Sequence, residues 1–415
     1  MDQIDIEINE IITNARIASA AQFEEIESIA LANQEKVLDA FTASGVSERH
    51  LKGSTGYGYG DIGRDTLCRV YADVFHAEAA IVSPLITGGT HALAVGLFGL
   101  LRPDDTLLSI TGKPYDTLDN IINGEDAGSM REYGIRYREI DLNGGKFDYQ
   151  AIEKALIACK PKVIFVTRSR GYSDRSALSI DDMAVCFARI KEIAPEAIIF
   201  VDNCYGEFVE AQEPTEVGAD VVVGSLIKNI GGGLAPTGGY LAGRSQWIEQ
   251  IANRLTAPGI GMEVGSYAFG YQYYYQGLFM APHIVANAMK GSLLFAHAFS
   301  ALGYDTIPSP TVRSYDIIRS IVFDTEAELV AFIREIQKVS PIDSNVVPYP
   351  WDMPGYRDPV IMAAGTFVSG ASIELSADAP IRAPYIAYIQ GALTYEHAVI
   401  AVKRCMKAVM EAKHG

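Results

Sequence analysis

The sequence predicts an α/β fold, with a large domain built on a mostly parallel sheet and a smaller α+β domain after it. Two observations carry this prediction. Between about residues 77 and 303, short runs of β-branched and apolar residues alternate with stretches of helical periodicity. Such alternation is typical of βαβ crossovers, which cover both faces of a parallel sheet with helices. After the prolines at 307–310 a second, shorter alternation begins, and we expect it to form a separate lobe.

The individual elements follow from the same patterns. Apolar residues at helical spacing up to about residue 50 predict one or two helices, and the glycines between 53 and 63 predict a loop. The expected strands of the large domain cover 80–84, 106–110, 135–140, 162–167, 197–202 and 220–226. The expected helices begin near 89 and cover 148–159, 181–193 and 281–302. In the smaller lobe the expected strands cover 315–323 and 371–375, and the expected helices cover 326–339 and begin again at 395.

The composition argues against several classes of protein. The chain has 415 residues, with 34 Lys and Arg against 51 Asp and Glu, and its net charge of −17 disfavours a nucleic-acid partner. The five cysteines form no CxxC pair and the seven histidines no paired spacing, so we expect neither a disulfide framework nor a metal site. The longest apolar run, at 92–101, is too short to span a membrane, and the N-terminus has no signal-peptide pattern. We therefore expect a cytoplasmic protein.

Asp202 and Lys228 are the first candidates for a site. Each follows a strong strand pattern, and in an open α/β sheet ligands bind beyond the carboxyl ends of the strands. A lysine in such a crevice suits covalent attachment to a carbonyl cofactor, and an aspartate can keep a pyridine nitrogen protonated so that the ring accepts electrons. Taken alone, the two residues fit a capping aspartate and a solvated loop lysine better.

A second set of residues reverses that balance. Gly88, Gly89 and Thr90 lie between a strand and a helix, where free backbone N–H groups and the helix dipole favour an anion such as phosphate. Ser225, three residues before Lys228, offers a hydroxyl to the same phosphate. Most such turns bind nothing, but the order of phosphate loop, aspartate, serine and lysine is specific to one cofactor chemistry.

Four segments, ITGGTHAL, ITGKPYDTL, VDNCYGE and GSLIKNIGGGLAPTGGYLAG, carry a resemblance to a known family. Over nearly its whole length the chain resembles the fold-type I pyridoxal-phosphate enzymes of cysteine and methionine metabolism, specifically the methionine gamma-lyase-related family often labelled aluminium resistance protein. The resemblance implies an aspartate-aminotransferase-like fold with a seven-stranded, mostly parallel sheet, and pyridoxal 5′-phosphate as cofactor. The residues to which it assigns cofactor binding are Lys228 as the attachment point, Asp202 at the pyridine nitrogen, and Ser225, Gly88, Gly89 and Thr90 at the phosphate.

The resemblance extends to residues around the cofactor. Tyr115, in the loop TGKPYDT, is the candidate for the aromatic ring that the relatives stack on the cofactor. The relatives also lend a tyrosine and an arginine from an N-terminal loop to the phosphate of the neighbouring subunit, and the candidates here are Tyr57, Tyr59 and Arg64. This implies a homodimer or homotetramer with shared active sites. The same loop contains a GxGxxG motif, but no strand precedes it, so a dinucleotide site is not indicated.

Three arginines are candidates for contacts with the cofactor or the substrate. Arg168 and Arg170 follow another strand of the sheet, and we expect Arg170 near the cofactor and Arg168 near the substrate carboxylate. Arginines at strand ends are about as often surface ion-pair partners. The relatives grip the carboxylate with an arginine of the small domain. The strand pattern at 382–391 has no arginine at the aligned place, so the candidate is Arg382, a few residues ahead.

The function that the resemblance implies is a pyridoxal-phosphate-dependent carbon–sulfur lyase acting on a sulfur amino acid, by elimination of the cystathionine beta-lyase or methionine gamma-lyase type. Two alternatives stay open, namely another reaction on the same fold, such as transamination, and a resistance factor that binds the cofactor without turnover. A nucleotide-binding protein is more remote. We expect three parts: an N-terminal helical arm and loop at 1–63 that contacts the neighbouring subunit, a cofactor domain at 64–303 and a small domain at 304–415.

Overall fold

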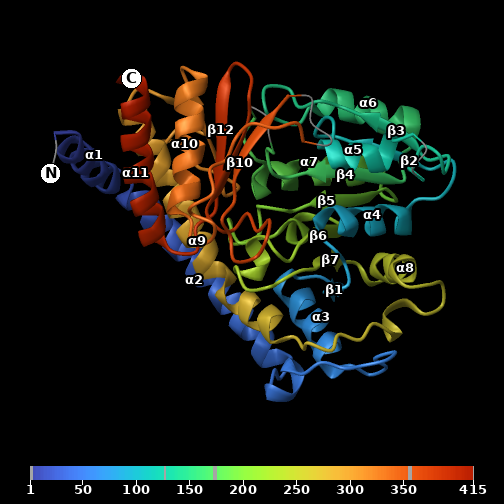
Figure 1. Cartoon of the computed structure of the whole chain (residues 1–415). Helices are drawn as coiled ribbons and strands as arrows, with labels where there is room; N and C mark the ends of the chain where they lie inside the picture. Colours follow the sequence, from blue (N-terminus) through green and yellow to red (C-terminus); the bar gives the residue numbers. More distant parts are fainter. Residues whose placement is uncertain (1–2, 126–127, 172–174, 354–357, 415) are drawn as a thin grey trace.

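The computed structural model describes residues 3–125, 128–171, 175–353 and 358–414, and two sheets with packed helices organise them (Figure 1). The larger sheet has seven strands in the order β1-β7-β6-β5-β4-β2-β3, and every pair is parallel except those that β7 makes with β1 and β6. Its strands are β1 (Ala79–Ser83), β2 (Thr106–Ser109), β3 (Arg136–Glu139), β4 (Val163–Thr167), β5 (Ile198–Asp202), β6 (Val221–Ser225) and β7 (Gly239–Gly243). The predicted α/β fold with a mostly parallel sheet is confirmed.

Both faces of the large sheet are covered, because successive side chains of a strand point to opposite faces. On β4, Ile164 and Val166 join one apolar core, whereas Val163 and Phe165 join the other. The helices on the first face include α3 (Ile62–Val74), α6 (Tyr149–Cys159) and α7 (Ile180–Ile193), and those on the second are α4 (Gly89–Leu100), α5 (Asp116–Asn123) and α8 (Ser245–Leu255). Burial on two faces explains why the strands read as unbroken apolar runs.

The smaller sheet is antiparallel, with the order β10-β11-β12-β9-β8. Its strands are β8 (Asp305–Ile307), β9 (Ile318–Phe323), β10 (Val360–Ala363), β11 (Ser376–Pro380) and β12 (Tyr385–Gln390). Helices α10 (Glu326–Val339) and α11 (Tyr395–His414) share its apolar core (Figure 1). Thr325 and Glu328 form a reciprocal capping box, which fixes the start of α10 at the predicted residue.

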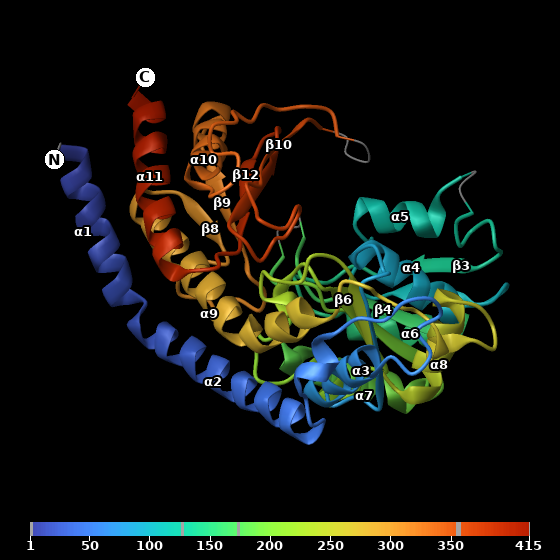
Figure 2. The same cartoon turned by 60° about the horizontal axis from the view of Figure 1, so that its bottom comes forward.

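The N-terminal arm runs along α9 (Gln272–Ala301) and joins the two parts of the chain (Figure 2). Helix α1 (Gln3–Ala18) buries Ile8 and Ile12 in the core of the small sheet, whereas α2 (Ala20–Ala43) packs against α9 and α3. Helix α9 itself contributes side chains to both cores. The predicted contact of the arm with a neighbouring subunit stays a prediction, as do the predicted domain boundaries.

Some elements differ from the prediction. The strand expected at 371–375 is wrong, because the Glu374 carboxylate accepts hydrogen bonds from the backbone N–H groups of Phe367 and Val368, both at 2.9 Å, and holds this segment in a turn before β11. The apolar strand pattern does not predict β7, because its sequence, GYLAG, begins and ends with glycine. The sequence patterns also do not predict α3, α5, α8, β8, β10 and β11.

The fold contains neither a membrane-spanning helix nor a metal cluster in the part of the chain that the structure describes. No described helix is both long enough and apolar enough to cross a bilayer. No three His, Cys, Asp or Glu side chains among the described residues are placed to hold a metal ion.

Candidate active site

The candidate site lies where two neighbouring strands of the large sheet end. Asp202 is the last residue of β5 and Ser225 is the last residue of β6, and these two strands are parallel. Lys228 follows β6 after a turn in which its backbone N–H bonds the carbonyl of Ser225 at 3.3 Å. Because parallel strands end at the same edge of a sheet, the fold brings the aspartate, the serine and the lysine together where α/β proteins bind ligands.

Asp202 is a buried carboxyl group. It is only 5% exposed, and the backbone N–H of Cys204 donates to its Oδ1 at 3.1 Å. Burial raises the pKa of Asp202, while the Lys228 ammonium and the hydrogen bonds from Cys204 oppose this rise. With little water to stabilise its charge, the carboxylate depends on cationic neighbours, so a protonated ring nitrogen placed against it would be held firmly.

The ammonium group of Lys228 lies 4.0 Å from the centroid of the Tyr205 ring, in a cation–π contact. Burial lowers the pKa of Lys228, but the acidic groups of Cys204, Tyr205, Asp202 and Tyr115 together raise it well above its ordinary value. Burial also raises the pKa of the Cys204 thiol well above its ordinary value. Lys228 therefore needs a change in its surrounding charge before it can act as a nucleophile.

Tyr205 belongs to the site although the sequence reasoning did not single it out. Its φ of +70° lies in the left-handed region, which residues other than glycine rarely adopt. The segment VDNCYGE contains it, three positions after Asp202. In the sequence, the only sign of Tyr205 was its position close after Asp202. That position does not reveal the left-handed backbone angle or the contact between the ring and Lys228.

Helix α4 begins at the loop in which the phosphate site is predicted. Gly88 is its N-cap and has no side chain that could accept hydrogen bonds from the first backbone N–H groups of the helix. These N–H groups are therefore free to bind an anion. A Cβ on Gly89 would lie 3.3 Å from the Cβ of Ser225 and 3.6 Å from the Sγ of Cys204, so glycine lets the loop approach the end of β6 closely. A Cβ on Gly88 would meet nothing within 4 Å. This open space before a helix N-terminus fits a phosphate group.

Tyr115 lies beside that loop. It is the N-cap of α5, and its hydroxyl is 3.2 Å from the Oγ1 of Thr90. Burial of the hydroxyl and the charge of Asp202 raise the pKa of Tyr115, whereas the Thr90 contact and Lys228 lower it. Because Asp202 and Lys228 both affect the pKa of Tyr115, the tyrosine lies at the same site as the predicted cofactor residues.

Arg168 lies among protein acceptors and is fully buried. Its guanidinium donates to the Oδ1 of Asn203 and the carbonyl of Gly206, both at 2.9 Å, and to Glu210 at 2.8 Å, with Glu213 at 3.7 Å. These partners all belong to the segment that follows β5. The guanidinium therefore supports this segment and does not present itself to a substrate carboxylate.

The other two candidate arginines lie in different surroundings. Arg170 is buried, and its guanidinium donates to the carbonyl of Ile307 and the hydroxyl of Ser320, so it joins the loop after β4 to the small sheet. The side chain of Arg382 is 59% exposed and forms an ion pair with Asp358 at 3.0 Å. Of these two, Arg382 is the arginine that presents its guanidinium to solvent.

The glycine-rich loop packs on residues 265–275 of its own chain, through hydrogen bonds that include those of Ser266 and Tyr271. Tyr57 and Tyr59 are 73% and 69% exposed, whereas Arg64, in the first turn of α3, is buried and bonds the carbonyl of Gly58 and the carboxylate of Asp65. The structure therefore does not bring these three candidates to the strand ends of the same chain. Both tyrosine side chains are therefore exposed to solvent in the single chain.

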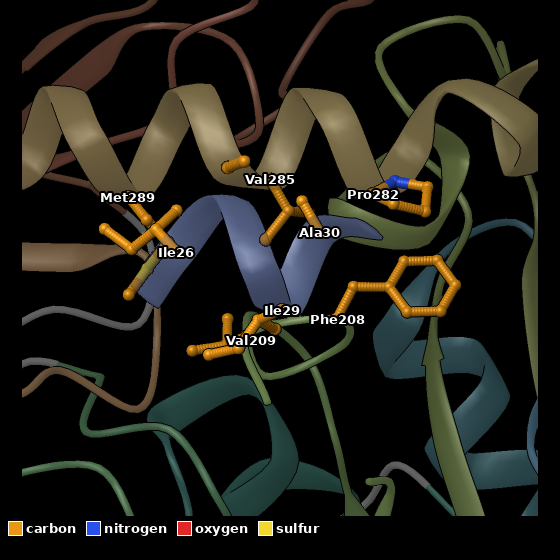
Figure 3. Close-up of a pocket in the computed structure, with 9 residues that line it drawn as sticks. Ile26, Ile29, Ala30, Phe208, Val209, Pro282, Val285 and Met289 are labelled. Atoms are coloured by element: carbon orange, nitrogen blue, oxygen red, sulfur yellow. The ribbon is translucent and has the colours of Figure 1, made fainter. Parts of the chain in front are cut away.

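A small apolar pocket lies between α2, α9 and the segment after β5 (Figure 3). Its volume is about 10 Å³, and its walls are apolar side chains that include Ile29, Phe208 and Val285. This is room for about one water molecule and provides no side-chain hydrogen-bonding group. The chemistry therefore belongs to the strand ends and not to this pocket.

The model of the methionine gamma-lyase family matches residues 8–410. The chain belongs to the methionine gamma-lyase family. The solved "carbon-sulfur lyase involved in aluminum resistance" from Clostridium novyi NT is 47% identical, with a TM-score of 0.93, and the match covers 97% of this chain and 96% of that chain. The solved "putative cystathionine beta-lyase involved in aluminum resistance" from Listeria innocua is 49% identical, with a TM-score of 0.95, and the match covers 96% of this chain and 98% of that chain.

Membership in the methionine gamma-lyase family confirms the resemblance found in the sequence. The solved "pyridoxal-5′-phosphate dependent protein YhfS" from Escherichia coli is 18% identical, with a TM-score of 0.63, and the match covers 94% of this chain and 97% of that chain. At this identity it shows the fold alone, and that fold is the predicted one. The family implies pyridoxal 5′-phosphate as cofactor, and the buried Asp202, Lys228 and the open N-terminus of α4 fit its ring nitrogen, its carbonyl and its phosphate.

Proposed function

We propose that this chain is a pyridoxal-phosphate-dependent carbon–sulfur lyase, which cleaves a carbon–sulfur bond of a sulfur amino acid by β- or γ-elimination. The observation that carries the proposal is that Asp202, Ser225 and Lys228 meet where the parallel strands β5 and β6 end, with the uncapped N-terminus of α4 close to the end of β6. The names of the two similar solved proteins, a carbon–sulfur lyase and a putative cystathionine beta-lyase, support this reaction class.

Each residue of the site has a distinct task in this proposal. Lys228 holds the cofactor through its amine and, once released, moves the α-proton of the substrate. Asp202 keeps a proton on the ring nitrogen, and Tyr115 orients the ring. The backbone N–H groups of 88–90 and the Ser225 hydroxyl bind the phosphate. Bound pyridoxal phosphate supplies an electron-withdrawing ring that stabilises negative charge at the substrate α-carbon.

The exposed tyrosines of the glycine-rich loop support an assembly with shared sites. Tyr57 and Tyr59 lie with ring centroids 5.6 Å apart and expose most of their surface. Solvent-exposed aromatic pairs of this kind are typical of interfaces. We expect at least a homodimer, in which this loop reaches the phosphate of the neighbouring subunit. Light scattering coupled to size exclusion tests this, and a monomer at micromolar concentration would contradict it.

Lys228→Ala tests the proposed function directly. The substitution removes the attachment point and the base, so we expect elimination to fall by at least about 10²- to 10⁴-fold, with no cofactor fixed to the chain by borohydride. The matched control is Lys154→Ala, an exposed position on α6, which should leave both properties unchanged. Absorbance spectra of the holoprotein are recorded after addition of cystathionine, cysteine, methionine or homocysteine. Release of thiol, ammonia and keto acid is measured in the same reactions.

The products separate the proposal from its alternatives. A lyase releases thiol and ammonia, whereas a transaminase leaves an aminated cofactor and no free thiol. A bound cofactor whose spectrum stays unchanged with every amino acid would indicate a binding protein without turnover. Either outcome would refute the lyase proposal.

A further inference from the structure

Tyr205 contacts the ammonium group of Lys228, but the proposed reaction gives this tyrosine no task. The centroid of its ring lies 4.0 Å from Nζ of Lys228. Among the residues that the structure describes, Nζ has no ion-pair or hydrogen-bond partner, so the ring is the contact that fixes its position. The face of an aromatic ring attracts a cation, and it does so more strongly where little water competes.

The backbone at Tyr205 has a conformation that is unfavourable for a tyrosine. The N–H of Gly206 donates to the carbonyl of Asn203 at 2.9 Å, which closes a turn with Tyr205 as its third residue. Glycine or asparagine adopts a φ of +70° at this position of a turn at lower cost. The backbone alone would therefore favour a smaller residue, and strained positions of this kind concentrate at functional sites.

Arg168 holds the turn that contains Tyr205. Its guanidinium donates to the carbonyl of Gly206 and to the Oδ1 of Asn203, both at 2.9 Å. A Cβ on Gly206 would lie 2.6 Å from the Cδ of Arg168, so glycine lets the turn approach the arginine side chain this closely. The buried arginine thus maintains the unfavourable backbone angle from the side of the large sheet.

A hydrogen bond also connects this turn to the segment that carries the lysine. The Nδ2 of Asn229, which directly follows Lys228, donates to the carbonyl of Glu207 at 3.0 Å. Glu207 lies two residues beyond Tyr205, and both Glu207 and Asn229 are fully buried. This bond therefore fixes the segment of the ring relative to the segment of the lysine.

We propose that Tyr205 is a positioning residue of this site, whose ring holds the Lys228 amine at the strand ends and stabilises its ammonium form. The inference rests on the proposed role of Lys228 as the base. When the amine takes the α-proton of the substrate, it becomes an ammonium, and the electrons of the broken C–H bond stay at the α-carbon. The ring stabilises this new charge, which burial disfavours, only once the proton moves. It should therefore raise kcat and leave KM unchanged.

The first test uses the cofactor-free protein and does not depend on the reaction. Tyr205→Leu removes the ring, whereas Tyr205→Phe retains the ring face and is the matched control. Acetic anhydride reacts with neutral amines, and peptide mass spectrometry measures its product on Lys228 at pH 7 relative to the exposed Lys154. Without the ring the ammonium is less stable, so labelling of Lys228 should rise by up to about thirtyfold in Tyr205→Leu. Tyr205→Phe should stay at the wild-type level.

The second test uses the holoprotein. In Tyr205→Leu, kcat for elimination should fall by up to about thirtyfold with unchanged KM and cofactor affinity, whereas Tyr205→Phe should keep the wild-type kcat. If Tyr205→Leu does not fold, Tyr205→Asn replaces it, because asparagine tolerates a positive φ.

Two results would overturn the proposal. One is equal labelling of Lys228 in the variants with and without the ring. The other is a loss of kcat in Tyr205→Phe, which would assign the effect to the hydroxyl group. Absence of borohydride fixation at Lys228 in the wild-type holoprotein would instead refute the proposed function, and the labelling of the cofactor-free protein would still decide the role of Tyr205.

Discussion

Arg168→Met should destabilise the fold strongly, because it removes the cation from a buried ion-pair cluster. Arg168 is fully buried, as is Glu213, and it also pairs with Glu210 at 2.8 Å and donates to Asn203. Removing one partner of a buried pair costs about 3–5 kcal/mol, which is roughly a hundred- to several-thousand-fold in the unfolding constant. Burial raises the pKa of Glu213 and Arg168 lowers it, so the variant can recover part of this loss by protonating Glu213. The destabilisation should therefore be smaller at pH 6 than at pH 8.

The assay is urea unfolding of the cofactor-free protein at both pH values, with Arg382→Met as the matched control. Arg382 forms an ion pair whose side chains are 59% and 35% exposed, and such pairs contribute about 0–1 kcal/mol. If Arg168→Met lowers the free energy of unfolding by less than about 1 kcal/mol, the role of Arg168 in supporting the segment after β5 is refuted. So would a stable Arg168→Met protein with a raised KM for the amino acid, because that result would make Arg168 a substrate ligand.

Three further substitutions test the site. Asp202→Asn should lower kcat/KM for elimination by about 10²-fold or more because the ring nitrogen loses its anionic partner, and an unchanged rate would contradict that role. Tyr115→Phe removes the hydroxyl that contacts Thr90 and should weaken cofactor binding by up to about tenfold, whereas unchanged affinity in a cofactor titration would separate Tyr115 from the site. Gly224→Ala should cost about 1–3 kcal/mol in urea unfolding because a Cβ there would overlap the ring of Tyr240, and a neutral result would mean that β6 and β7 can move apart.

Much of the fold was predictable because it depends on local patterns. The strands buried on two faces read as unbroken apolar runs and were found from the sequence. The helix at 326–339 was also found, and a local capping box at its start stabilises it. The turn at 371–375 was not predictable, because its residues are apolar and β-branched enough for a strand, and the Glu374 carboxylate that bonds two backbone N–H groups decides otherwise. Strand β7 was missed because its conformation comes from pairing with both β1 and β6.

The sequence by itself determined where the candidate site lies. Asp202, Ser225 and Lys228 stand at strand ends, and the edge of a parallel sheet brings such positions together whatever the remaining details are. Only the tertiary structure decided which polar side chains serve the ligand and which serve the protein. Arg168 looks like an active-site residue in the sequence, but it is enclosed by acceptors of its own chain. The energy of a buried charge depends on every group around it, and those groups come from segments far apart along the chain.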